Sequence, residues 1–225
     1  MILSDQSVII LSPETKEQAI RNVREIEYAA RNCYASQDKI TDTSYLTMVK
    51  SLIKRGHEAP VEFADMTVDI TTSRAVLAEI TRHRMSSFCV ESQRYIQEAK
   101  TGDITFIKPD WYDDSNDDDM SAMWHSSMRM AEICYKNLIN EGAKPEQARE
   151  VLPNSTACRI IMRANLREWR HVFQLRCSTA AYPPMRSLML NLLKQAHELI
   201  PCVFDDIYEQ YFEEDKPDGL LPVET

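Results

Sequence analysis

Glycine is scarce in this sequence. Among 225 residues it occurs only at Gly56, Gly102, Gly142 and Gly219. Glycines so placed form neither a GxGxxG turn nor a P-loop, because both motifs need glycines a few residues apart. The usual dinucleotide-binding folds are therefore excluded, and any bound nucleotide must be held by side chains and helix ends.

Long apolar runs and paired cysteines are also missing. No stretch approaches the roughly 20 apolar residues that span a bilayer. The apolar run at residues 8–11 is too short for a secretory signal and lacks basic flanks. The cysteines form no CxxC pair and no zinc spacing; they are Cys33, Cys89, Cys134, Cys158, Cys177 and Cys202. We expect reduced thiols in a cytoplasmic protein with no membrane partner and no metal site.

Acidic side chains outnumber basic ones, and the net charge is −9. This negative charge argues against nucleic acid as a partner. Acidic side chains concentrate in residues 110–119, which we expect to form a surface loop without chemistry, and again after Asp205. Residues 159–186 are instead rich in basic side chains: they include six arginines, His171 and a single acid, Glu168. We expect a locally basic site there, suited to a small anionic ligand.

Periodic apolar positions and the placement of proline and glycine predict the secondary structure. Helices are expected at residues 14–34, 42–54, 74–82, 120–140, 145–151, 166–176, 184–199 and 201–212. Strands are expected at residues 7–12, 63–71, 104–107 and 158–162. This mixture predicts an α+β fold: a single domain over residues 1–225, with a small antiparallel or mixed sheet packed against several helices. Residues 213–225 are expected to fray.

The most distinctive stretch begins with Arg82-His83-Arg84, three adjacent basic residues expected where a helix gives way to a loop. An amphipathic helix buries only about one of three adjacent positions, so an anion lying against the cluster explains it most simply. Arginine offers a planar fork of donors that matches phosphate. Charge alone fits equally well a solvated basic helix end that complements the helix dipole.

After a gap of seven residues the basic triplet is followed by Ser92-Gln93-Arg94-Tyr95. The triplet, the gap and the Ser-x-Arg-Tyr sequence together resemble the signature of flavin-dependent thymidylate synthases. The stretch from Gly56 to Glu62 is similar to that family's Gly-His-x-x-Pro-x-Glu segment, which lies beside the flavin. The resemblance implies that His57, Ala59 and Glu62 contact the cofactor; taken alone, His57 would be a cap or surface residue.

Later segments extend the resemblance. Arg149 lies in a segment similar to the family's Ala-Arg-x-x-Leu-Pro, whose arginine reaches a neighbouring subunit's nucleotide. Asn165, Arg167 and His171 resemble a motif that contacts flavin, and their spacing puts Arg167 and His171 on one helix face. Arg176 resembles the arginine of a Leu-Arg pair that engages the pyrimidine. It is the expected catalytic residue, since a guanidinium stays charged and polarises the ring.

The resemblance implies transfer of a one-carbon unit from methylenetetrahydrofolate to dUMP, giving dTMP, with FAD as the cofactor and NADPH as its reductant. Arg82, His83, Arg84 and Val90 would join the flavin contacts. The implied dUMP contacts are Glu79, Arg82, Glu91, Ser92, Gln93, Arg94, Arg149 and Arg176. The stretch from Arg82 to Tyr95 would hold two adjoining half-sites. The family's homotetramers share active sites between subunits, so we expect this chain to self-associate.

The sequence departs from the family pattern at several positions. Some members have a threonine where this chain has Ala59, and an Asn-Glu pair where it has Cys89-Val90. Some have a histidine at the position of Ala180, and a glutamine is common at that of Tyr182. Glu79 would repel an adjacent phosphate unless an arginine intervenes. Ser92 lacks a Ser-His-acid setting, so we expect it to bind the nucleotide rather than to attack. The cysteines are expected to line the core or pockets.

A second function is open on the residues alone: a non-catalytic nucleotide- or RNA-binding regulator that uses the same basic patches. The net acidity and the lack of aromatic residues interleaved with basic ones weigh against it. Flavin absorbance of the purified protein separates the two functions.

Overall fold

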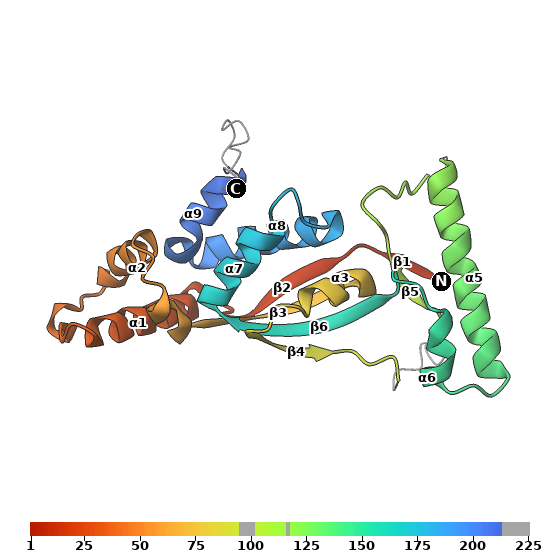
Figure 1. The fold of residues 1–225 in the computed structure, drawn as a ribbon, viewed down its shortest axis with the longest axis horizontal. Helices are drawn as coiled ribbons and strands as arrows, with labels where there is room; N and C mark the ends of the chain where they lie inside the picture. Colours follow the sequence, from red (N-terminus) through yellow and green to blue (C-terminus); the bar gives the residue numbers. More distant parts are fainter. Residues whose placement is uncertain (95–101, 116–117, 213–225) are drawn as a thin grey trace, which may run out of the picture.

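The computed structural model describes residues 1–94, 102–115 and 118–212 and has the expected α+β architecture (Figure 1). Its main sheet is antiparallel, in the order β2 (Ser7–Ser12), β3 (Asp65–Ser73), β6 (Ala157–Asn165) and β4 (Ser86–Val90). A separate parallel pair joins β1 (Ile2–Ser4) to β5 (Thr105–Ile107). The predicted small antiparallel or mixed sheet is confirmed.

Alternation along β3 and β6 gives the main sheet one buried face. The buried side chains face each other in register: Met66 with Ala164, Val68 with Met162, and Ile70 with Ile160. Intervening residues such as Asp65, Arg159 and Arg163 point to the other face, because successive side chains of a strand alternate. One face therefore belongs to the core, and the other carries charged side chains.

Helices pack against the buried face and continue beyond one end of the sheet (Figure 1). They are α1 (Lys16–Asn32), α2 (Ser44–Lys54), α3 (Arg74–Ile80), α7 (Leu166–Arg176), α8 (Pro183–Leu199) and α9 (Pro201–Phe212). Trp169 of α7 is fully buried, and its ring N–H donates to Met66 O at 2.9 Å. Phe173 stacks edge-on against Phe204 of α9. These contacts lock α7 between the sheet and α9.

A second, smaller core lies at the opposite end of the molecule from α1 and α2 (Figure 1). Here α5 (Asp119–Asn140), α6 (Pro145–Ala148) and the 3₁₀ helix η3 (Arg149–Val151) pack beside β1 and β5. Ile104, Phe106 and Tyr135 are its largest buried residues. Two further 3₁₀ helices, η1 (Gln37–Lys39) and η2 (Ala59–Phe63), lie in connections.

Most predicted elements are confirmed to within a few residues. Ser73 caps α3, accepting a hydrogen bond from Val76 N. The strand expected at residues 158–162 extends to Asn165. β1 and β4 were not predicted, so the loop expected after Arg84 is in fact a strand from Ser86. The expected tail at 213–225 lies outside the described residues. Within the described part, none of the helices has the length and apolar character needed to cross a membrane.

Candidate active site

The junction between β6 and α7 positions Asn165, Arg167 and His171 of the expected site. Asn165 ends the strand and caps the helix, since its side-chain oxygen accepts from Glu168 N at 2.8 Å. Leu166 N donates to Ala64 O at 2.8 Å, which holds the first turn of α7 beside η2. The start of β4 comes to the same place, because Ser86 pairs with Ala164. Segments distant in sequence therefore meet at the beginning of α7.

His83 turns inward, whereas its neighbours Arg82 and Arg84 are exposed. The His83 side chain is only 3% exposed, and its Nε2 accepts from Arg176 Nε at 3.1 Å. Burial, together with repulsion from Arg176 and His171, lowers the pKa of His83 to about 4. His83 is therefore uncharged at neutral pH. The expectation of three adjacent cations is wrong, and only Arg82 and Arg84 present charge.

Arg176, at the end of α7, is held by three acceptors. Besides the bond to His83, its Nη1 donates to Glu79 Oε2 at 2.9 Å and its Nη2 donates to the Glu79 carbonyl at 3.1 Å. The side chain is 16% exposed. Arg176 thus neutralises Glu79, so an arginine does stand beside this acid. A guanidinium has about five N–H bonds, and those not engaged here stay available to a ligand.

A cavity of about 370 Å³ opens beside this group, lined by Glu58, Glu62, Met85, Asn165, Arg167, Glu168, His171 and Gln174. Asn165, Arg167 and His171 therefore line one cavity, and Arg167 and His171 share one side of α7, as predicted. Arg167 Nη1 donates to Glu62 Oε1 at 2.6 Å, and its Nε lies 3.7 Å from Glu58 Oε2. The acids outnumber the single guanidinium, so the lining suits an uncharged ring with polar edges better than a phosphate.

His83, Glu168 and His171 offer ligand atoms within 4.8 Å of one another, but their hydrogen bonding does not fit a metal ion. Arg176 Nε can only donate, so His83 Nε2 supplies the lone pair and Nδ1 carries the proton of the neutral ring. That Nδ1 faces Glu168 Oε1 at 3.4 Å. With its proton in place, Nδ1 has no lone pair for a cation, and Arg176 would repel one.

Of the residues expected to bind dUMP, Glu91, Ser92, Gln93 and Arg94 follow the last residue of β4. Glu79 and Arg176 instead lie beside His83, before the strand begins. Arg84 precedes this strand and Glu91 follows it, and Ser86 and Val90 are about 13 Å apart at about 3.3 Å per residue. Ser92 Oγ accepts from Arg94 N at 3.3 Å. Within one chain the two half-sites therefore lie at opposite ends of β4.

The segment after β4 approaches α6. Arg94 Nε lies 3.5 Å from Glu146 Oε2, and Arg149 follows α6 at the start of η3. Gln93 has a buried side-chain nitrogen with no acceptor among the described residues. α6 lies at the far end of the molecule from α1 (Figure 1). Because Arg149 directly follows α6, it belongs with the Ser92–Arg94 half of the expected site.

The basic site expected from the arginines of residues 159–186 does not form. Arg159 pairs with Asp69, and Arg163 Nη2 lies 2.6 Å from Asp65 Oδ2, both on the charged face of the sheet. Arg170 is buried and pairs with Asp206 at 2.7 Å. Acids distant in sequence neutralise these side chains, so local charge was a poor guide.

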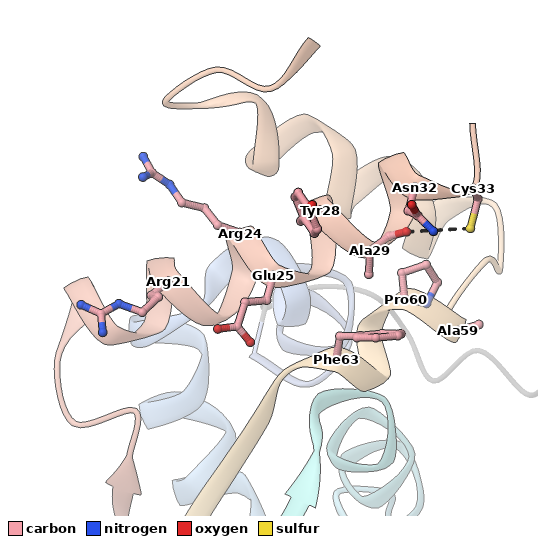
Figure 2. A pocket seen from close by; sticks show the side chains of 10 residues that line it. All are labelled: Arg21, Arg24, Glu25, Tyr28, Ala29, Asn32, Cys33, Ala59, Pro60 and Phe63. Carbon is pink, nitrogen blue, oxygen red and sulfur yellow. Dashed lines mark hydrogen bonds between the residues drawn. The ribbon is translucent and has the colours of Figure 1, made fainter. Parts of the chain in front are cut away.

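His57 and Ala59 lie outside the cavity beside α7. His57 is exposed, one residue after Gly56, whose φ of +70° ends α2. Ala59 instead lines a larger, mainly apolar groove of about 820 Å³. Figure 2 shows Tyr28, Ala29, Asn32 and Cys33 of the α1 region facing Ala59, Pro60 and Phe63 of η2.

The cysteines are free thiols, as expected. Burial raises the pKa of Cys158 to about 11 and that of Cys177 to about 12, so neither supplies a thiolate at neutral pH. Cys33 lines the groove of Figure 2. Cys89 is exposed on β4, so its expected place in the core or a pocket is wrong.

Sequence reasoning missed Glu58 and Glu168, which line the cavity. Glu168 was noted only as the one acid among arginines, although it lies three residues before His171 and hence on the same side of α7. Tyr182, one of the departures from the family pattern, caps α8. Burial and the charges of Asp110 and Glu79 raise the pKa of the Tyr182 hydroxyl.

Both the sequence and the fold of this chain are similar to those of known proteins. Residues 18–202 match the model of a family described as thymidylate synthase complementing protein. A flavin-dependent thymidylate synthase of Geobacter sulfurreducens is 30% identical over 188 residues, 80% of each chain. One from Synechocystis sp. is 30% identical over 191 residues, 79% of this chain and 86% of the relative. The structure of a UMP/dUMP methylase, PolB from Streptomyces cacaoi bound with 5-Br dUMP, superimposes with a TM-score of 0.74 at 22% identity, covering 94% of this chain and 98% of that chain. This last likeness shows a shared fold.

Proposed function

The chain belongs to the family of flavin-dependent thymidylate synthases, and from this membership we propose that it converts dUMP to dTMP by reductive methylation. The bound cofactor is FAD, the carbon donor is methylenetetrahydrofolate and the reductant is NADPH. One observation carries the proposal: His83 and Arg176, 93 residues apart in sequence, are hydrogen bonded beside a cavity lined by Asn165, Arg167 and His171.

The residues around the cavity fit the ring system of a flavin. Its volume of about 370 Å³ lies near the lower limit of small-molecule sites, about 300–1,000 Å³, so it accommodates a ring system rather than a whole dinucleotide. Asn165, Arg167 and His171 offer donors and acceptors to polar ring edges. The exposed Arg82 and Arg84 lie outside the acidic lining and suit the phosphates.

When bound, the flavin supplies the hydride of the reaction, and the protein supplies orientation and charge. Arg176 engages the pyrimidine and favours the electron distribution needed for attack on it. Ser92 and Arg94 bind the nucleotide phosphate, with Arg149 from a neighbouring subunit. His57, Ala59, Glu62 and Val90 complete the flavin contacts, and Glu79, Glu91 and Gln93 those of the nucleotide.

Assembly as a homotetramer with active sites shared between subunits would accommodate the separation of the two half-sites. The two ends of β4, next to Arg84 and Glu91, are about 13 Å apart. We therefore expect the two half-sites of one chain to contact different parts of the ligands. A site shared between subunits would bring the Ser92–Arg149 half of one chain to the Arg176 half of another.

The direct test is optical. We expect the purified protein to be yellow or to take up FAD, and to reduce it anaerobically with NADPH in a way that dUMP alters. A protein that stays colourless after incubation with FAD would overturn the proposal. Binding of RNA by such a protein would then favour the non-catalytic regulator.

Variants separate the roles of two arginines. We expect Arg176→Lys to retain FAD but to lose most tritium release from labelled dUMP, because lysine lacks the fork that reaches both His83 and Glu79. Arg84→Ala should first weaken flavin retention. Arg163→Lys is the matched control, since this arginine lies on the charged sheet face beside Asp65. Unchanged tritium release by Arg176→Lys would remove Arg176 from its role.

A further inference from the structure

Glu168 lies next to His83, which is hydrogen bonded to Arg176 in the candidate site. Its side chain is 12% exposed, and its Oε1 is 3.4 Å from His83 Nδ1. Its backbone is fixed as well, because Glu168 N donates to the capping oxygen of Asn165. Glu168 is therefore held in the first turn of α7, with its carboxylate facing His83.

The hydrogen bond between Arg176 and His83 requires one tautomer of the imidazole. Arg176 Nε is always a donor, so His83 Nε2 must be the nitrogen without a proton. The proton is then on Nδ1, the nitrogen that faces Glu168 Oε1 at 3.4 Å. In the other tautomer two N–H groups would face each other across 3.1 Å, while Nδ1 would offer a lone pair to a carboxylate.

We propose that Glu168 is a positioning residue: its carboxylate keeps the proton of His83 on Nδ1, so that Nε2 can hold Arg176 in place. This inference rests on the role of Arg176 in the proposed function. Glu79 fixes both terminal nitrogens of the guanidinium, and His83 fixes Nε. The N–H bonds left over then point in one fixed direction, which is what polarising a substrate ring requires.

The proposal predicts a specific NMR result. In ¹⁵N-labelled protein, the ring nitrogens of His83, assigned by their loss in His83→Gln, should show a protonated Nδ1 and an unprotonated Nε2. A scalar coupling across the Nε–H···Nε2 bond should connect Arg176 to His83. In Glu168→Leu the proton should move to Nε2 and the coupling should vanish. Glu168→Gln keeps an acceptor oxygen and should keep both signals.

The second test measures the rate of tritium release from dUMP. Glu168→Leu, assayed with saturating FAD, should release tritium from dUMP about tenfold more slowly, the effect of losing roughly one hydrogen bond to a charged group. Glu17→Leu, which removes an exposed acid from the first turn of α1, is the matched control and should keep the wild-type rate. Glu168→Gln should retain most of the rate.

The outcomes distinguish the two proposals. If Glu168→Leu keeps the proton on Nδ1 and the coupling to Arg176, the positioning role of Glu168 is overturned, whatever the activity. If the wild-type protein takes up no FAD, the proposed function fails, while the ring shifts still report whether Glu168 sets the tautomer.

Discussion

Protonation of His83 should weaken the fold in a defined pH window. An unfolded histidine titrates near about 6.5, whereas the pKa of His83 in the folded chain is about 4. Between these values the unfolded chain binds more protons, so the free energy of unfolding rises with pH. The contribution of His83 is complete above pH of about 6.5 and is lost as the pH falls toward 4. The cause is structural, because a proton added to Nε2 would meet the donor of Arg176.

The size of the effect follows from the shift. The pKa of His83 falls from about 6.5 in the unfolded chain to about 4 in the folded chain. At pH of about 4 this difference lowers the free energy of unfolding by roughly 3 kcal/mol, and about 2 kcal/mol of that is already lost at pH of about 5. Urea unfolding at neutral pH and at pH of about 5 would measure it. Since carboxylates titrate in every variant, the useful quantity is the difference between wild type and His83→Gln, whose amide oxygen can still accept from Arg176.

The comparison needs an exposed histidine as its control. His57→Gln should keep the wild-type pH dependence, whereas His83→Gln should lose about 2 kcal/mol less than wild type on going to pH of about 5. If wild type and His83→Gln respond equally to acid, His83 titrates normally. The neutral ring, and with it the tautomer that Arg176 requires, would then be refuted.

Two further predictions concern the framework of the site. Arg170→Met should lower the free energy of unfolding by about 3 kcal/mol, because it leaves Asp206 and the buried Val203 carbonyl without their donor; a loss near zero in chemical denaturation would contradict this. Asn165→Ala should cost about 1 kcal/mol by removing the cap of α7. Asn165→Asp, which can still accept from Glu168 N, should retain most of that stability by the same measurement.

Local rules predicted the elements well, because the relevant information is local. Ser73 and Asn165 cap helices through their own side chains, and Gly56 ends α2 with a positive φ that glycine adopts freely. β4 was missed for the opposite reason. Its sequence, residues 86–90, has no clear alternation, and it forms because β6 offers it a partner about 70 residues later in the chain.

Site residues were harder to place than elements, because charge in the sequence does not show which acid each base will meet. Asp69 lies 90 residues from Arg159, and Asp65 lies 98 residues from Arg163. The same limit applies to the basic triplet. The bend after α3 turns His83 into the core and leaves Arg82 and Arg84 in solvent, which adjacent positions in a sequence do not reveal.

The register of β4 constrains how any ligand can use this chain. Each residue from Ser86 to Val90 is paired with β6, from Ala164 back to Ile160, so the strand neither shortens nor slips without exposing its partner. A ligand group that contacts Arg176 at one end is therefore kept apart from Ser92 at the other. The seven-residue gap between the basic triplet and Ser92 therefore contains a strand of fixed length, with Arg84 before its first residue and Glu91 after its last.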